Sequence, residues 1–431
     1  ATNAFTLTEP YLGFREDNLG VENFDDCLYA EVKENGILFG CPVISPHLQD
    51  LAKKLNFPKQ QGGTILLYLE TLFSVSLFEN ESLTSDGGEA DSITYQTRLL
   101  KIILLVLQYH LPRSYYNIPQ ELPLAELLEQ NDTLNGALIQ LEVVLLDTVT
   151  LQGYSSLGNR QNNFAFSKLY FFLLWARENA GSDISAPESY LELDQKLREE
   201  MIFIFAALIW ADDYVDSTEE KVIENYIEQT GLQQSKQNEL TQRIRKPVKI
   251  ADLHCSFTAV ILGSYLVEQL ILLSLIDNQD AWQERELIEK ISLQLGLSLE
   301  KLEQLYGTVA EFFSVHNERL EFLKNNAAVH QFQDYMNDKI VKIVRKNVGN
   351  IMNEIKETKE LSELLVKATT KPLTAREKEK VREQLMDVAR SIPALAIFAL
   401  PGGGLLLPVL IKVLPFNILP SSFQDEPESS Q

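Results

Sequence analysis

Residues 392–423 read IPALAIFALPGGGLLLPVLIKVLPFNILPSSF, and no ordinary soluble core helix has this composition. No charge lies between Arg390 and Lys412, and this run is about as long as the ~20 apolar residues that a membrane-spanning helix needs. Glycines and prolines interrupt it, and an interior proline removes a backbone hydrogen bond and clashes with the preceding turn. The prolines are Pro393, Pro401, Pro408, Pro415 and Pro420. Two interpretations follow: a membrane segment, or an apolar hairpin buried against the rest of the chain with its prolines at the corner.

Charge is distributed unevenly along the 431 residues. The formal net charge is −23, which argues against non-specific binding to nucleic acid over most of the molecule. Residues 335–390 nevertheless carry 13 Lys and Arg against 9 Asp and Glu, a local charge of +4. This basic segment directly precedes the apolar run, as expected for the flank of a membrane segment on a negative inner surface. The three cysteines show no CxxC spacing, so we expect a reducing compartment.

Apolar runs upstream predict a mainly α, multi-helical bundle. Residues 64–78 and 97–110 are apolar on nearly all sides and too short to span a bilayer, so both are typical of core helices. Residues 335–355 carry apolar side chains at helical spacing. Residues 27–44 fit either a helix that ends at Gly36 or two short strands joined by a turn, and we favour the helix.

Two central stretches resemble each other. Residues 201–232 and 265–297 each contain an apolar helix pattern, a short acidic turn and an amphipathic helix pattern that ends in Gly-Leu. The matching residues are Ala207, Asp212, Asp213, Asp216, Glu219 and Glu220 in the first copy, and Asp277, Glu284 and Glu286 in the second. This pattern resembles the TerB-like fold of tellurite-resistance and DnaJ-associated proteins, so we expect a pseudo-repeated TerB-like domain.

The expected domains follow from these patterns. They are an N-terminal helical domain (1–185), a TerB-like repeat domain (190–320), a helical hairpin with the proline-rich apolar C-terminal segment (335–423) and a disordered tail (424–431).

The acidic turn of the first copy is the candidate metal site. Asp212, Asp213 and Asp216 could bind a divalent cation, since clustered carboxylates suit hard ions, although their spacing is not that of an EF-hand. A structural interpretation stays open as well. Ser217 and Glu220 fit a capping box, and acidic residues at a helix start stabilise the helix dipole.

Known catalytic motifs do not occur in the sequence. It contains no HExxH, no G-x-G-x-x-G, no P-loop and no G-x-S-x-G, and its five histidines include no i, i+4 pair. We therefore expect no enzyme, and no cofactor apart from a divalent cation at the acidic turn.

Short motifs follow one another in a fixed order within residues 358–423. They are Leu373-Thr374 with Arg376-Glu377 at a helix start, Pro393 and Pro401, Leu406-Leu407-Pro408 followed by Lys412, and an ending of Leu414-Pro415, Leu419-Pro420-Ser421 and Phe423. In this order they resemble the membrane segment of the LETM family, the leucine-zipper and EF-hand transmembrane proteins of mitochondria.

The resemblance implies cation/proton exchange, with one departure. The family has an acidic residue within its membrane run, where this chain has Gly404, and an intramembrane carboxylate is what ion coupling would need. The family also continues into a ribosome-binding-like domain after its signature. This sequence ends eight residues beyond Phe423, so we expect that domain to be missing here.

A second resemblance concerns the order of the regions. TerB-like repeats before a LETM-like segment are similar to bacterial LETM-related, biofilm-associated proteins. Residues 27–40, CLYAEVKENGILFG, fit the N-terminal region of that group.

Together these features predict a non-enzymatic, membrane-associated helical scaffold. We expect it on the cytoplasmic side of the inner membrane or, alternatively, in the soluble cytoplasm, with its C-terminal segment contacting the membrane or a protein partner. The residues expected to matter in this segment are Pro393, Pro401, Pro408, Lys412, Pro415 and Phe423. Cation/proton exchange and a TerB-like, divalent-metal-binding stress module are the alternatives. No nucleic-acid partner is expected, and assembly into an oligomer stays open.

Overall fold

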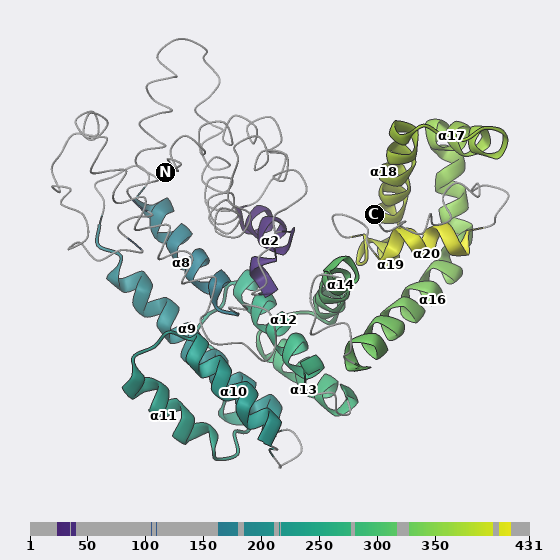
Figure 1. Cartoon of the computed structure of the whole chain (residues 1–431). Helices are drawn as coiled ribbons and strands as arrows, with labels where there is room; N and C mark the ends of the chain where they lie inside the picture. Colours follow the sequence, from purple (N-terminus) through teal and green to yellow (C-terminus); the bar gives the residue numbers. More distant parts are fainter. Residues whose placement is uncertain are drawn as a thin grey trace, which may run out of the picture. The chain divides into compact units, whose positions relative to one another are not determined.

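A computed structural model gives the fold of this chain (Figure 1). It describes residues 24–34, 36–39, 105, 109, 163–179, 185–210, 215, 217–276, 281–316, 327–399 and 405–414. These residues are almost all helical and contain no β-strand, which confirms the prediction of a mainly α, multi-helical protein. The backbone contacts divide the chain into a first unit, Ala1–Gln269, and a second unit, Leu270–Gln431.

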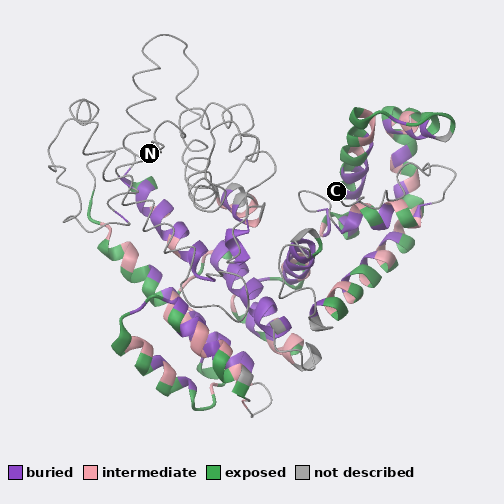
Figure 2. Ribbon diagram, viewed as in Figure 1, coloured by how far each residue is buried: buried purple, intermediate pink, exposed green. Residues whose placement is uncertain are grey.

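Long helices and short connections make up the described part of the first unit. It contains α2 (Phe24–Glu34), η1 (Ile37–Phe39), α8 (Ala165–Glu178), α9 (Glu188–Ile209), α10 (Ser217–Gln229), α11 (Gln234–Ile244), η5 (Ile250–Asp252) and the start of α12 (Val260–Ile276). Helix α8 packs on α9, and α9 in turn contacts α10 and α11. Figure 2 shows buried residues along nearly the whole of α8, whereas α11 carries them on one side only.

Aromatic side chains fill the core around α8. Phe166, Phe172 and Trp175 are completely buried, and the ring of Phe166 lies 4.8 Å from that of Tyr265 on α12. Burying a large apolar side chain contributes about 1.5–3 kcal/mol, so a run of aromatic residues on one helix is enough to hold α8 inside the unit. The run FSKLYFFLLW therefore forms a core helix.

Within residues 27–44 the structure describes 27–34 and 36–39, which belong to α2 and η1 with the turn at Gly36. Helix α2 ends at Glu34, before Gly36, so the prediction of a helix is confirmed for these residues. The three residues of η1 are buried, and the side-chain amide of Gln269 donates to the Leu38 carbonyl at 2.7 Å.

A buried polar cluster joins α8, α9 and the end of α10. Arg198 donates two hydrogen bonds to Asp194, at 3.0 and 2.5 Å, and a third to the Thr230 carbonyl at 2.7 Å. The hydroxyl of Ser167 donates to Asp194 at 2.7 Å. Because a buried charge is costly unless it is paired and hydrogen-bonded, this cluster fixes how the three helices meet.

The second unit continues from α12 with a set of helices arranged around one long helix. They are α13 (Ala281–Gln294), α14 (Leu299–His316), α16 (Ala327–Glu357), α17 (Lys359–Thr370), α18 (Ala375–Ser391), α19 (Pro393–Ala396) and α20 (Leu406–Val413). Helix α16 contacts α14, α17, α18, α19 and α20. Its buried side chains form one stripe at helical spacing: Val329, Met336, Ile340, Val344, Ile351 and Ile355.

Stacked side chains reinforce the contacts of α13, α14 and α16. The guanidinium of Arg285 lies 5.2 Å from the ring centre of Tyr306 and 4.7 Å from that of Tyr335. It also pairs with Glu303 at 3.3 Å, and Glu303 pairs with Lys339. One arginine on α13 thus contacts both neighbouring helices.

The two resembling central stretches end in the same local conformation. Gly231 follows α10 with a φ of 64°, and Gly296 follows α13 with a φ of 78°. Glycine adopts this left-handed conformation without strain, which explains the Gly-Leu ending of both stretches. The TerB-like relation itself and the expected domain boundaries stay predictions.

Candidate functional site

The predicted metal ligands Asp212, Asp213 and Asp216 lie outside the described residues. Among the residues that are described, no group of three or more His, Cys, Asp or Glu could hold a metal ion. Helix α10 begins at Ser217 and has Glu219 and Glu220 in its first turn, where the helix dipole stabilises negative charge. The metal site therefore stays a prediction.

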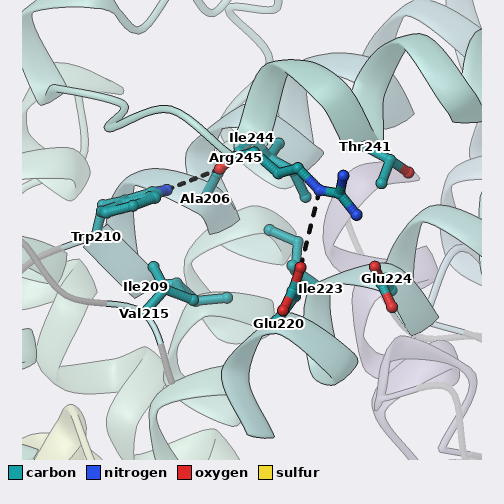
Figure 3. Close-up of a pocket in the computed structure, with 10 residues that line it drawn as sticks. All are labelled: Ala206, Ile209, Trp210, Val215, Glu220, Ile223, Glu224, Thr241, Ile244 and Arg245. Atoms are coloured by element: carbon teal, nitrogen blue, oxygen red, sulfur yellow. Dashed lines mark hydrogen bonds and ion pairs between the residues drawn. The ribbon is translucent and has the colours of Figure 1, made fainter. Parts of the chain in front are cut away.

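A cavity lies in the first unit where α9, α10 and α11 meet (Figure 3). Its volume is about 190 Å³. The lining residues are Ala206, Ile209, Trp210, Val215, Glu220, Ile223, Glu224, Thr241, Ile244 and Arg245. This site could not be predicted from the sequence, because its walls come from α9, α10, α11 and the residues beside them, and no spacing along the chain brings these together.

Hydrogen bonding fixes the position of Trp210 in the cavity wall. Its indole N–H donates to the Ile244 carbonyl at 2.8 Å, which links the end of α9 to the end of α11. Figure 3 shows Arg245 extending from the same end of α11 towards Glu220, and these two side chains pair at 3.8 Å. The cavity thus combines an apolar wall with charged groups at its edge.

The second candidate region is the start of α18, within the LETM-like motifs. Thr374 and Glu377 form a capping box: the Glu377 N–H donates to the Thr374 hydroxyl at 3.3 Å, and the Thr374 N–H donates to the Glu377 carboxylate at 3.0 Å. Lys367 donates to the same carboxylate at 2.5 Å. This lysine, with the Thr374 N–H as a second cause, lowers the pKa of Glu377 from 4.5 to about 2. The motif Leu-Thr-x-Arg-Glu is thus a helix start stabilised by its own side chains.

Prolines of the C-terminal segment stand where a helix tolerates them. Pro393 is the first residue of α19, and Pro408 is in the first turn of α20, where backbone N–H groups have no partner within the helix. Both α19 and α20 contact α16 and α18. The segment is therefore divided into two short helices that pack on longer ones. Pro401, Pro415 and Phe423 lie outside the described residues.

Helix α20 has two different faces. Leu406, Val409 and Leu410 are buried, whereas Pro408 and Lys412 are exposed one turn apart. In the described part of the chain, no helix combines the length and the apolar character needed to cross a membrane.

Helix α16 presents an exposed basic surface opposite its buried stripe. Between Asp338 and Glu354 the helix contains no acidic residue. We call the exposed cations Lys342, Arg345, Lys346 and Lys356 the α16 basic face. None of the four forms a hydrogen bond or ion pair through its side chain with another described residue. The sequence shows the local excess of positive charge, but only the folded helix shows that these cations lie on one face.

Comparison with known protein families gives one match. Residues 373–431 match the family model described as LETM1-like, RBD. The match begins at Leu373, the first residue of the helix-start motif, and supports a relation to the LETM family for this part of the chain. It also corrects one expectation. We expected the family's ribosome-binding-like domain to be missing here, whereas residues 373–431 match the model described as LETM1-like, RBD.

Searches among curated proteins and among solved structures gave no significant match.

Proposed function

We propose that this chain is a non-enzymatic helical scaffold, related to the LETM family, that associates with an anionic membrane surface through its second unit. We place it, within the same proposal, on the cytoplasmic side of the inner membrane. The observation that carries the proposal is the α16 basic face, whose four cations have no described partner.

Physical reasons connect this face with anionic lipid. Clusters of 4–8 Lys and Arg on an amphipathic helix are typical of binding to anionic headgroups, and each contributes about 1 kcal/mol near the surface. The net charge of −23 opposes approach by most other parts of the molecule. The same unit contains α20, whose Lys412 is exposed beside Pro408 and could lie at the level of the headgroups.

Vesicle flotation tests the proposal. We expect the full chain to float with vesicles that contain an anionic phospholipid. With vesicles of a neutral phospholipid, it should remain in the bottom fraction. The triple variant K342Q/R345Q/K346Q should bind anionic vesicles roughly a hundredfold more weakly, since three cations contribute about 3 kcal/mol together.

A matched control separates position from total charge. Lys196, Lys246 and Lys249 are exposed cations of the first unit without a described side-chain partner, so K196Q/K246Q/K249Q changes the net charge by the same amount. This control should bind like the original chain. Equal loss in both triple variants, or equal binding to neutral vesicles, would contradict the proposal.

The relation to the LETM family supports a second candidate, cation/proton exchange. Gly404 stands where the family has an acidic residue, which argues against it. Cation flux into proteoliposomes, driven by a pH gradient and dependent on the protein, would replace the scaffold proposal with exchange.

A further inference from the structure

The cavity between α9, α10 and α11 has the features of a small binding site. Its volume of about 190 Å³ is below the roughly 300–1,000 Å³ of pockets that hold drug-sized ligands, so it suits a smaller molecule. A single ring or a short alkyl chain would fit. The membrane proposal does not use this cavity, which lies in the other unit.

The walls select a ligand with an apolar body. Ala206, Ile209, Val215, Ile223 and Ile244 supply aliphatic surface around the Trp210 indole. The polar atom of that indole is already used by its hydrogen bond to the Ile244 carbonyl. The ring therefore offers apolar and aromatic surface to a ligand, and its position is fixed before the ligand binds.

The charged residues select the head group. Glu220 is paired with Arg245, although at 3.8 Å and with both side chains more than half exposed. Glu224 lies one turn further along α10, is half-buried, and its side chain has no partner among the described residues. The lining residues thus carry one negative charge that nothing described balances.

We propose that this cavity binds a small organic amine, with its apolar body against Trp210 and its ammonium group paired with Glu224. A carboxylate complements an ammonium group in charge and in hydrogen bonding. An anionic ligand would meet two carboxylates and only one guanidinium.

Fluorine NMR of the full chain labelled with 5-fluorotryptophan tests this site. The chain has three tryptophans, so three resonances are expected, and the W175F and W282F variants assign that of Trp210 by elimination. The probes are 2-phenylethylamine and 3-phenylpropanoate, which share a ring and a short chain but carry opposite charges. We expect a saturable shift of the Trp210 resonance with the amine and none with the carboxylate.

Glu224→Gln keeps the shape of the side chain and removes its charge, so it should weaken amine binding at least tenfold. Glu228→Gln is the control, because Glu228 lies on the same helix, is exposed and does not line the cavity. Equal binding of both probes, no saturable shift with the amine, or unchanged affinity in Glu224→Gln would each overturn the proposal.

Discussion

Two glycines illustrate how one residue type can have opposite effects on stability. Gly296 ends a helix with a φ of 78°, a conformation that costs roughly 1–2 kcal/mol for a residue with a Cβ. Gly349 lies in the middle of α16, and a Cβ placed there meets no atom within 4 Å. Glycine inside an exposed helix is about 1 kcal/mol less favourable than alanine, so Gly349 costs stability without a packing reason among the described residues.

Alanine substitution at these two positions should therefore change the free energy of unfolding in opposite directions. We expect Gly349→Ala to raise it by up to about 1 kcal/mol and Gly296→Ala to lower it by about the same amount or more. Chemical denaturation followed by circular dichroism measures both. A loss of stability in Gly349→Ala would contradict this prediction.

At the scale of elements, local signals predicted helices at two places that the structure describes, whereas the predicted core helices 64–78 and 97–110 lie outside the described residues apart from 105 and 109. The Leu-Thr-x-Arg-Glu motif predicted a helix start, and the capping box of Thr374 and Glu377 is its physical basis, because all of its hydrogen bonds join residues three apart. The choice of a helix at α2 was correct for the same reason, since it depends on neighbours along the chain.

Contacts between distant elements could not be predicted in this way. Nothing in the spacing of α20 indicates that it packs on α16, because many apolar faces in the chain are equivalent partners. Only the folded arrangement of α9 and α11 brings the N–H of Trp210 to the Ile244 carbonyl. The α16 basic face could not be predicted either, because the side of α16 that is exposed depends on which helices pack against it.

The start of α18 leads to a prediction about helix capping and pH. Thr374→Ala should lower the free energy of unfolding by about 1 kcal/mol at neutral pH, since it removes the N-cap. Glu377 has a lowered pKa of about 2, so its contribution is complete above pH 4.5 and is lost as the pH falls from 4.5 towards 2.

Denaturation at a series of pH values measures this contribution. In Glu377→Gln, stability should fall less steeply between pH 4.5 and 2 than in the original chain. If the two profiles keep the same slope, the carboxylate of Glu377 does not stabilise the helix start through its charge.

At the scale of the whole molecule, the net charge of −23 affects folding and binding in opposite ways. Like charges repel one another in the compact state, and salt screens that repulsion over a Debye length of about 10 Å at 0.1 M. Salt screens the attraction between the α16 basic face and anionic lipid by the same physics.

Raising the NaCl concentration should therefore increase the melting temperature and decrease the fraction bound to anionic vesicles. Thermal melts and flotation at matched low and high salt measure the two effects. Vesicle binding that does not change with salt would show that apolar contacts, rather than the cations of α16, hold the protein on the surface.

The contact of α16 with α20 also sets an order of events during translation. The ribosome must synthesise helices α17, α18 and α19 before α20 emerges. At ~5–20 residues per second, the synthesis between the end of α16 and the start of α20 takes on the order of 2–10 s. For that interval the part of the apolar stripe of α16 that α20 later covers lacks this partner in the nascent chain. A chaperone that recognises exposed apolar helices has this time in which to bind, and a ribosome that stalls after α18 would leave the stripe partly open to aggregation.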